Sequence, residues 1–203
     1  MVMLITDPTT EDQVRARRVA SGADLFDEVW DGVYVVAPFP NDEHQEIVAE
    51  LIAALHASVA APKLGKVRPS VNVSDRDEGW AENYRAPDVA VFLRGTKAIN
   101  RKTHWHGGPD FAVEILSSGD RAREKLDFYA KVQVRELLVV DRTPWRLELY
   151  RLARTKLRPV GTSESNASEP IASKVLPLTF RLVADRPRPM IEITQVDGRR
   201  CEV

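Results

Sequence analysis

Residues 111–116, FAVEIL, form a short strand-like run that decides the fold and carries a misplaced charge. Because side chains alternate along a strand, Glu114 shares its face with Ala112 and Leu116, while the other three residues, all apolar, point the opposite way. Both faces are otherwise apolar, so we expect this strand to lie between two layers of structure. A carboxylate there costs several kcal/mol unless a metal ion or a hydrogen-bonded cation compensates it.

A second apolar run, residues 86–93 (APDVAVFL), presents the same problem. Asp88 falls on the face of Ala90 and Phe92, and Pro87 before it has no N–H, so the strand begins or is irregular there. Each acid alone is also compatible with a strand end or bulge from which the carboxylate reaches solvent or caps a neighbour. The recurrence of both acids on adjacent strands of one sheet would weigh against that alternative.

The segments around these two runs predict an α/β domain with a mixed central sheet flanked by helices. The Asp31-Gly32 pair predicts a hairpin turn, and Asn41 is a good cap for a long helix with apolar residues at helical spacing. We expect helices at 9–20, 41–59 and 120–134, and strands at 26–30, 33–36, 67–73, 86–93, 111–116, 136–141, 146–152, 156–160 and 190–194. The Ser-rich stretch 161–173 is predicted to be a loop.

The length of 203 residues suits one domain, with a core at about 25–160 and a strand-rich C-terminal extension at 161–203. The formal net charge of −1 gives no general indication of nucleic-acid binding, so an anion-binding surface would need local clustering. The single cysteine, Cys201, excludes an intrachain disulfide and fits a reducing compartment. No apolar run approaches the roughly 18 residues of a membrane span, and the N-terminus is unlike a signal peptide, so we expect a cytoplasmic protein without a membrane partner.

Lys125 borders the apolar stripe of the helix predicted after Glu114, between Ala122 and Tyr129. It would be a surface lysine with its stem against Tyr129, or it would reach the two acids. Two carboxylates and a lysine at the ends of adjacent strands suit metal-assisted phosphodiester hydrolysis. Carboxylates hold Mg²⁺, the ion lowers the pKa of a bound water, and a lysine orients that water and adds positive charge.

Several motifs in a fixed order resemble the Uma-two family of restriction-endonuclease-like proteins, which belongs to the PD-(D/E)XK nuclease superfamily. They are GVYVVAP (32–38), NDEH (41–44), APDVAV (86–91), VEILSS (113–118), DRAREK (120–125) and ELLVVD (136–141), with Tyr129 and Tyr150. The resemblance covers about residues 25–155. It implies a restriction-endonuclease-like core, here with an N-terminal helix and β-hairpin.

The resemblance also implies roles for single residues. Asp88 and Glu114 match the motif acids that bind a catalytic Mg²⁺ or Mn²⁺ ion, and the backbone carbonyl of Ile115 would be a further ligand. The usual lysine position, two residues after the glutamate, holds Leu116 here, and Lys125 matches a displaced lysine supplied by the following helix.

Two further site residues are expected on the long helix. The superfamily often adds an acid there, for which Glu46 is our choice over Glu43 and Glu50. His44 matches a family position near the start of the helix, where it would act in catalysis or serve as a capping or packing residue. The sequence departs from the family at Gln133, where glycine usually ends the helix, and at Ser118, which is often proline.

The loop 94–108 offers a nucleic-acid contact, since it has no acid and carries four basic residues: Arg94, Lys97, Arg101 and Lys102. Trp105 in the same loop would stack on an unpaired base or pack on the core. We therefore expect a metal-dependent endonuclease that hydrolyses DNA, working as a homodimer. A catalytically silent binding or scaffold module with the same fold, and an RNA-directed nuclease, are the alternatives.

Overall fold

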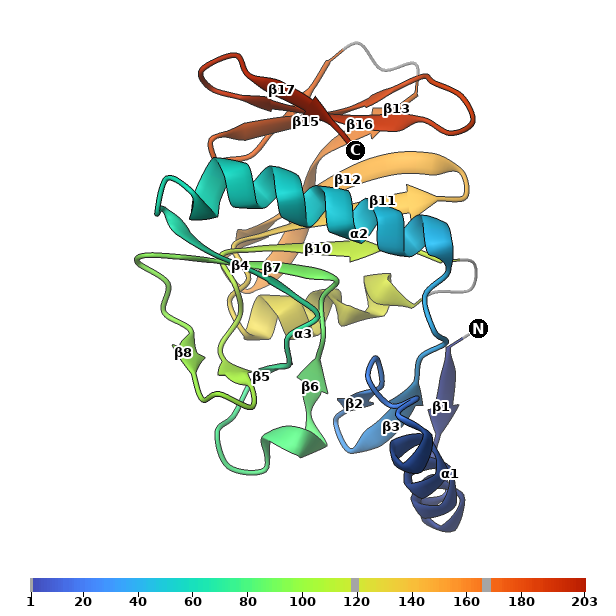
Figure 1. Ribbon diagram of the computed structural model, residues 1–203. Coiled ribbons are helices and arrows are strands. Elements are labelled where there is room, and N and C mark those ends of the chain that lie inside the picture. Colours follow the sequence, from blue (N-terminus) through green and yellow to red (C-terminus); the bar gives the residue numbers. More distant parts are fainter. Residues whose placement is uncertain (1, 118–120, 166–168) are drawn as a thin grey trace.

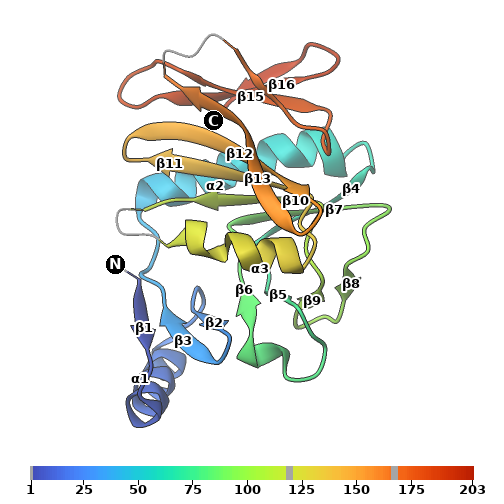
Figure 2. The ribbon, with the colours of Figure 1, turned by 180° about the vertical axis from the view of Figure 1, so that it is seen from behind.

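The computed structural model describes residues 2–117, 121–165 and 169–203, which form three sheets and the helices around them (Figure 1). Ser118 and Asp120, which belong to the motifs quoted above, lie outside these residues. The layers confirm a mixed α/β protein: α2 covers one face of the central sheet, and α3 covers the other (Figures 1 and 2).

The central sheet contains both of the strands that carry the misplaced acids. Its strands, in spatial order, are β13 (Lys156–Glu164), β12 (Trp145–Ala153), β11 (Glu136–Arg142), β10 (Phe111–Ile115), β7 (Val89–Leu93) and β4 (Gly65–Pro69). Strands β10 and β11 are parallel, and the other pairs are antiparallel. Since β10 pairs directly with β7, the acids at 88 and 114 lie on neighbouring strands, as predicted.

Helix α2 (Asp42–Leu55) begins at the predicted cap, where the Asn41 side chain accepts the His44 N–H at 3.1 Å. A π-helical turn, η1 (His56–Ala60), extends it to the predicted length. Its buried residues pack on the face of β10 that carries Phe111, Val113 and Ile115. The helix thereby directs its first turn toward the carboxyl end of β10.

The helix predicted at 120–134 is shorter and less regular than expected. It consists of a 3₁₀ turn, η3 (Ala122–Lys125), followed by α3 (Leu126–Lys131). Gln133 follows the helix with a φ of 68°, a left-handed conformation that explains why glycine suits this position. The apolar side of α3 packs on Ala112 and Leu116, so Glu114 faces this helix.

A second sheet lies beside the central one and contains the predicted hairpin. In spatial order its strands are β1 (Met3–Ile5), β3 (Val33–Val36), β2 (Glu28–Trp30), β6 (Tyr84–Arg85), β5 (Val73–Ser74), β9 (Trp105–His106) and β8 (Ile99–Asn100). Asp31 and Gly32 turn the hairpin with φ values of 49° and 85°, as the Asp-Gly pair predicts. Helix α1 (Pro8–Ser21) precedes it, capped by Asp7 and ended by Gly22, and a short 3₁₀ turn, η2 (Trp80–Glu82), precedes β6.

The prediction of one strand at 67–73 was wrong. The chain leaves the central sheet after β4, passes through Ser70 at a φ of 37°, and joins the second sheet as β5. Positions 94–108, treated as a loop, likewise contain β8 and β9. The sequence pattern cannot show which sheet a strand joins, because side chains alternate in the same way along the strands of both sheets.

The C-terminal sheet consists of β14 (Ile171–Ala172), β15 (Leu178–Val183), β16 (Met190–Gln195) and β17 (Arg200–Glu202), all antiparallel. It packs on the α2 face of the central sheet, where Phe180 stacks on Phe111 with ring centroids 5.7 Å apart. Strand β16 confirms the predicted run 190–194, whereas β13 continues to Glu164, into the expected loop. Within the described part of the chain, every helix is too short or too polar to cross a bilayer.

Candidate active site

Five of the six sequence-predicted site residues meet in one small cavity at the carboxyl end of β10. The cavity has a volume of about 90 Å³ and is lined by Asp88, Glu114, Lys125 and His44, together with Glu28 of the hairpin. These residues come from β7, β10, η3, α2 and β2, so both the central and the second sheet contribute. Ile115 also lines the cavity.

Asp88 lies directly before β7 and is held by two hydrogen bonds. Its Oδ2 accepts the backbone N–H of Ile115 at 2.7 Å, and its Oδ1 lies 3.0 Å from His44 Nε2. The β7–β10 ladder runs only as far as the Val89–Val113 pair, so the carboxylate takes over an N–H beyond the end of the ladder. Asp88 therefore lies at a strand end and caps a neighbouring N–H, as the alternative expected, and its side chain also lines the cavity.

Glu114 is buried, with 4% of its surface exposed. Both of its carboxylate oxygens lie 3.2 Å from Lys125 Nζ, and the Tyr129 hydroxyl donates a hydrogen bond to Oε1. Burial raises the pKa of Glu114 to about 8; Lys125 opposes this rise, and the nearby Asp88 and Glu28 add to it. Glu114 is thus poised to take up or release a proton near neutral pH.

Lys125 is not a surface lysine, because only 9% of it is exposed and its ammonium lies inside the cavity. Its Nζ lies 2.9 Å from Glu28 Oε1, closer than to either oxygen of Glu114. The 3₁₀ turn that carries Lys125 packs Ala122 into the core, and this fixes the start of the lysine side chain. The lysine consequently joins two buried carboxylates from different sheets.

Sequence reasoning missed Glu28 and Tyr129. Glu28 is 4% exposed; its Oε1 accepts the Ala86 N–H at 2.8 Å and its Oε2 accepts the Trp30 indole N–H at 2.6 Å. Glu28 could have been found in the same way as Glu114, because it is also an acid inside a predicted strand. The hairpin, however, was used only to predict a turn. Tyr129 was assigned to the apolar stripe, and that pattern could not show where its hydroxyl points.

The helix acid chosen from the sequence does not reach the cavity. Glu46 is exposed, and its carboxylate lies 3.2 Å from Arg188 of the C-terminal region. The reason is helical geometry: Glu46 is two residues after His44, which turns it about 200° around the helix axis. Glu50 also faces Arg188, at 3.6 Å, and Glu43 pairs with Arg142 at 2.5 Å.

The donor chemistry suits Mg²⁺ or Mn²⁺, since Asp88, Glu114 and the Ile115 carbonyl offer the oxygen ligands these ions prefer. The present orientations are occupied by other partners, because Asp88 holds Ile115 and His44 while Glu114 holds Lys125 and Tyr129. Among the residues that the structure describes, no group of three or more His, Cys, Asp or Glu side chains is arranged to hold an ion. An ion bound by both acids would therefore have to compete with Lys125 and Tyr129 for the Glu114 carboxylate.

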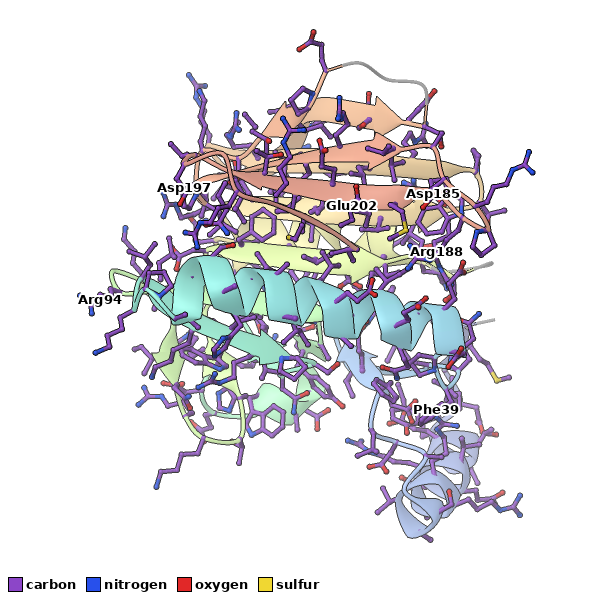
Figure 3. The ribbon with its side chains drawn as sticks, turned by 45° about the horizontal axis from the view of Figure 1, so that its top comes forward. Phe39, Arg94, Asp185, Arg188, Asp197 and Glu202 are labelled. Carbon is purple, nitrogen blue, oxygen red and sulfur yellow. The ribbon has the colours of Figure 1, made fainter. Side chains whose placement is uncertain are left out.

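The basic loop is remote from this cavity. Arg94 projects at the end of the molecule where α2 finishes, whereas Phe39, which lines the cavity, lies near its start (Figure 3). Arg94, Lys97 and Lys102 are exposed, but Arg101 is paired with Asp77 at 2.5 Å. Trp105 is 6% exposed and stacks on Phe92, with ring centroids 3.6 Å apart. The core-packing alternative is therefore correct for Trp105.

The chain has a mixed α/β fold, and a solved structure shares this fold. A crystal structure of a putative nuclease belonging to DUF820 from Anabaena variabilis ATCC 29413 is similar, with a TM-score of 0.57 and 17% sequence identity. The similarity covers 72% of this chain and 81% of that one, and at this identity it bears on the fold alone.

The chain belongs to the Uma2 family, described as "Putative restriction endonuclease", whose profile matches residues 18–185. This confirms the resemblance to the Uma-two family found from the motifs. A search of curated proteins gives no match.

Proposed function

We propose that this protein is a metal-dependent endonuclease that hydrolyses phosphodiester bonds in DNA. The observation that supports this most directly is the convergence of Asp88 and Glu114, from neighbouring strands, on one cavity that also holds the Lys125 ammonium. Membership of a family described as "Putative restriction endonuclease" supports the same reaction class.

In this proposal Asp88, Glu114 and the Ile115 carbonyl hold Mg²⁺ or Mn²⁺. Bound there, the ion supplies an activated water and offsets the negative charge of the scissile phosphate. Lys125 donates hydrogen bonds to the attacking water or to a phosphate oxygen, adding positive charge where negative charge develops.

His44 and Tyr129 orient the two acids. His44 Nε2 lies 3.0 Å from Asp88 Oδ1 and the Tyr129 hydroxyl donates to Glu114 Oε1, so each acid is oriented by a neighbouring side chain. In the described part of the chain His44 Nδ1 is buried without a hydrogen-bond partner, which leaves that nitrogen available for a proton or a water molecule. The sequence left His44 as a catalytic residue or as a capping or packing residue, and its contact with Asp88 supports a role in orienting that acid.

Asp88→Asn and Lys125→Met test the proposal. Purified wild-type protein with Mn²⁺ should nick or linearise supercoiled plasmid, and each variant should lose activity by about a hundredfold or more, because a metal ligand or a transition-state charge is removed. Asp110→Asn is a matched control. Asp110 is also a buried acid and directly precedes β10, but its carboxylate binds the Leu93 N–H and Arg135, which do not line the cavity. Equal cleavage by wild-type protein and by both site variants would refute the assignment.

A catalytically silent binding module is the second candidate, and one observation favours it. The Glu114 carboxylate already has internal partners in Lys125 and Tyr129, so the cavity is balanced without an ion. Calorimetric titration of Mn²⁺ into wild-type protein and Glu114→Gln separates the candidates. An endonuclease should bind Mn²⁺ in a way that the substitution weakens, whereas a silent module should give the same heats in both proteins.

For the DNA contact, we propose that Arg94, Lys97 and Lys102 bind the phosphate backbone. Arg94 lies near the far end of α2, whose 14 residues span about 20 Å, so it would contact DNA several base pairs from the cleaved bond (Figure 3). Changing all three to glutamate should weaken binding and flatten the dependence of log K on log salt, each lost contact removing about 0.9 from the slope. Lys156→Glu, on strand β13, is the control; an unchanged slope in the triple variant would exclude this surface.

The homodimer expected from the sequence stays a prediction.

A further inference from the structure

We propose that Glu28 is the positioning residue for Lys125, which keeps its ammonium in the cavity when Glu114 turns to a metal ion. This inference rests on the proposed function for its catalytic part, but its structural part can be tested on the metal-free protein. Glu28 comes from the hairpin of the second sheet, outside the strands and helices that carry the nuclease motif.

The first support is the geometry of the ammonium. Lys125 Nζ lies 2.9 Å from Glu28 Oε1 and 3.2 Å from each oxygen of Glu114. Glu28 therefore makes the shorter contact, although Glu114 lies far nearer in the sequence. Both acids have side chains that are only 6% exposed, so water screens neither contact well.

The second support is that Glu28 is fixed on both oxygens, as a holder must be. Oε1 accepts the Ala86 N–H at 2.8 Å and Oε2 accepts the Trp30 indole N–H at 2.6 Å. The Trp30 ring is in turn held against the guanidinium of Arg85, 4.8 Å from the ring centroid. Turning Glu28 away from Lys125 would break these hydrogen bonds, so its carboxylate stays where it is.

The third support is charge balance during metal binding. If Glu114 turned to a bound ion, Lys125 would lose this carboxylate as a hydrogen-bond acceptor, and a buried ammonium with fewer anionic partners is less stable. Glu28 keeps a carboxylate at hydrogen-bond distance from Lys125 in either state of Glu114. Lys125 can then remain beside the reacting phosphate rather than turn out to solvent.

The structural part is tested by NMR of metal-free protein with ¹³C-labelled lysine, in a Glu114→Gln background that removes the Glu114 charge from Lys125. A fixed ammonium gives two distinct shifts for the ε-methylene protons of Lys125, and Lys125→Met identifies the signal. Glu114→Gln alone should keep the two shifts distinct; adding Glu28→Gln should merge them, whereas adding the control Asp110→Asn should leave them apart. Two distinct shifts retained in Glu28→Gln/Glu114→Gln would overturn the inference, whatever the protein's activity.

The catalytic part is tested by cleavage kinetics with Mn²⁺. Glu28→Gln should lower kcat by about 10- to 100-fold while KM changes by less than about threefold, as for other residues that orient catalytic groups. The double variant Glu28→Gln/Lys125→Met should be no slower than Lys125→Met, because Glu28 acts only through the lysine. An additive loss in the double variant would overturn the inference.

Trp30→Phe provides a second route if Glu28→Gln does not fold. It removes one hydrogen bond from Glu28 but keeps its charge, and should give smaller changes in the same two measurements. Failure of the wild-type protein to cleave would count against the proposed function alone, since the NMR result is independent of turnover. Merged shifts with no cleavage would therefore separate the two conclusions.

Discussion

At the residue scale, the cost of burying Glu114 is partly offset from within the chain. The sequence predicted that this acid needs a compensating cation, and Lys125 supplies the charge at 3.2 Å with Tyr129 adding a hydrogen bond. Asp88, Glu114 and Lys125 could be chosen from alternation, helical spacing and the family motifs. Glu28 could not, because its contact with Lys125 depends on how the second sheet docks, which no local pattern records.

The raised pKa of Glu114 predicts a specific dependence of stability on pH. Folding favours the protonated carboxyl, so its contribution is complete below the ordinary value near 4.5 and is lost as pH rises toward about 8. Glu114→Gln is neutral throughout and lacks this loss. Urea unfolding at several pH values should show the wild type losing stability relative to Glu114→Gln as pH rises from 5 to 8. If the difference in the free energy of unfolding between wild type and Glu114→Gln is constant over this range, Glu114 is already ionised at pH 5.

At the scale of single elements, elements with a capping or turn signal were predicted best. The Asp31-Gly32 hairpin and the Asn41-capped helix are both present, because the residues that set them act locally. The strand expected at 67–73 failed, since Ser70 turns the chain from one sheet to another and alternation is the same in both. The acids of α2 were predicted on the right element but on the wrong face, as Glu46 shows.

The end of α3 gives a test at this scale. Gln133 has a φ of 68°, which costs a non-glycine residue roughly 1 kcal/mol, so Gln133→Gly should raise the free energy of unfolding by about that amount. Gln133→Ala keeps the strain and loses only the hydrogen bond from Nε2 to the Ala130 carbonyl, so it should not stabilise. Urea midpoints with an unchanged m value would measure both effects. Equal midpoints for the glycine and alanine variants would show that φ is relaxed in solution.

At the scale of the whole molecule, the C-terminal sheet shares the main apolar core. Phe180 is fully buried and stacks on Phe111, while Glu136 of the central sheet accepts the backbone N–H of Lys174 at 3.0 Å. The sequence predicted a strand-rich extension at 161–203, but not which face of the central sheet it covers. That choice follows from α2 covering only part of its side of the sheet (Figure 1).

Phe180→Ala tests this packing. Removal of a fully buried phenylalanine should cost about 3–5 kcal/mol and lower the Tm by many degrees. Val196→Ala, in the same sheet region but 85% exposed, should change stability by less than about 0.5 kcal/mol. Thermal unfolding followed by circular dichroism compares the two. A small loss in Phe180→Ala would indicate that the C-terminal sheet is only loosely attached.

The contact between Lys125 and Glu28 joins residues 97 positions apart, and this matters while the chain is being synthesised. Glu28, Asp88 and Glu114 all leave the ribosome before Lys125 and Tyr129 do. A nascent chain that ends before residue 122 therefore has the three acids of the cavity but lacks the lysine and the tyrosine that contact them. The cavity closes only after the hairpin, made early, meets a helical turn made much later, so a truncated product ending before that turn carries the acids without a working site.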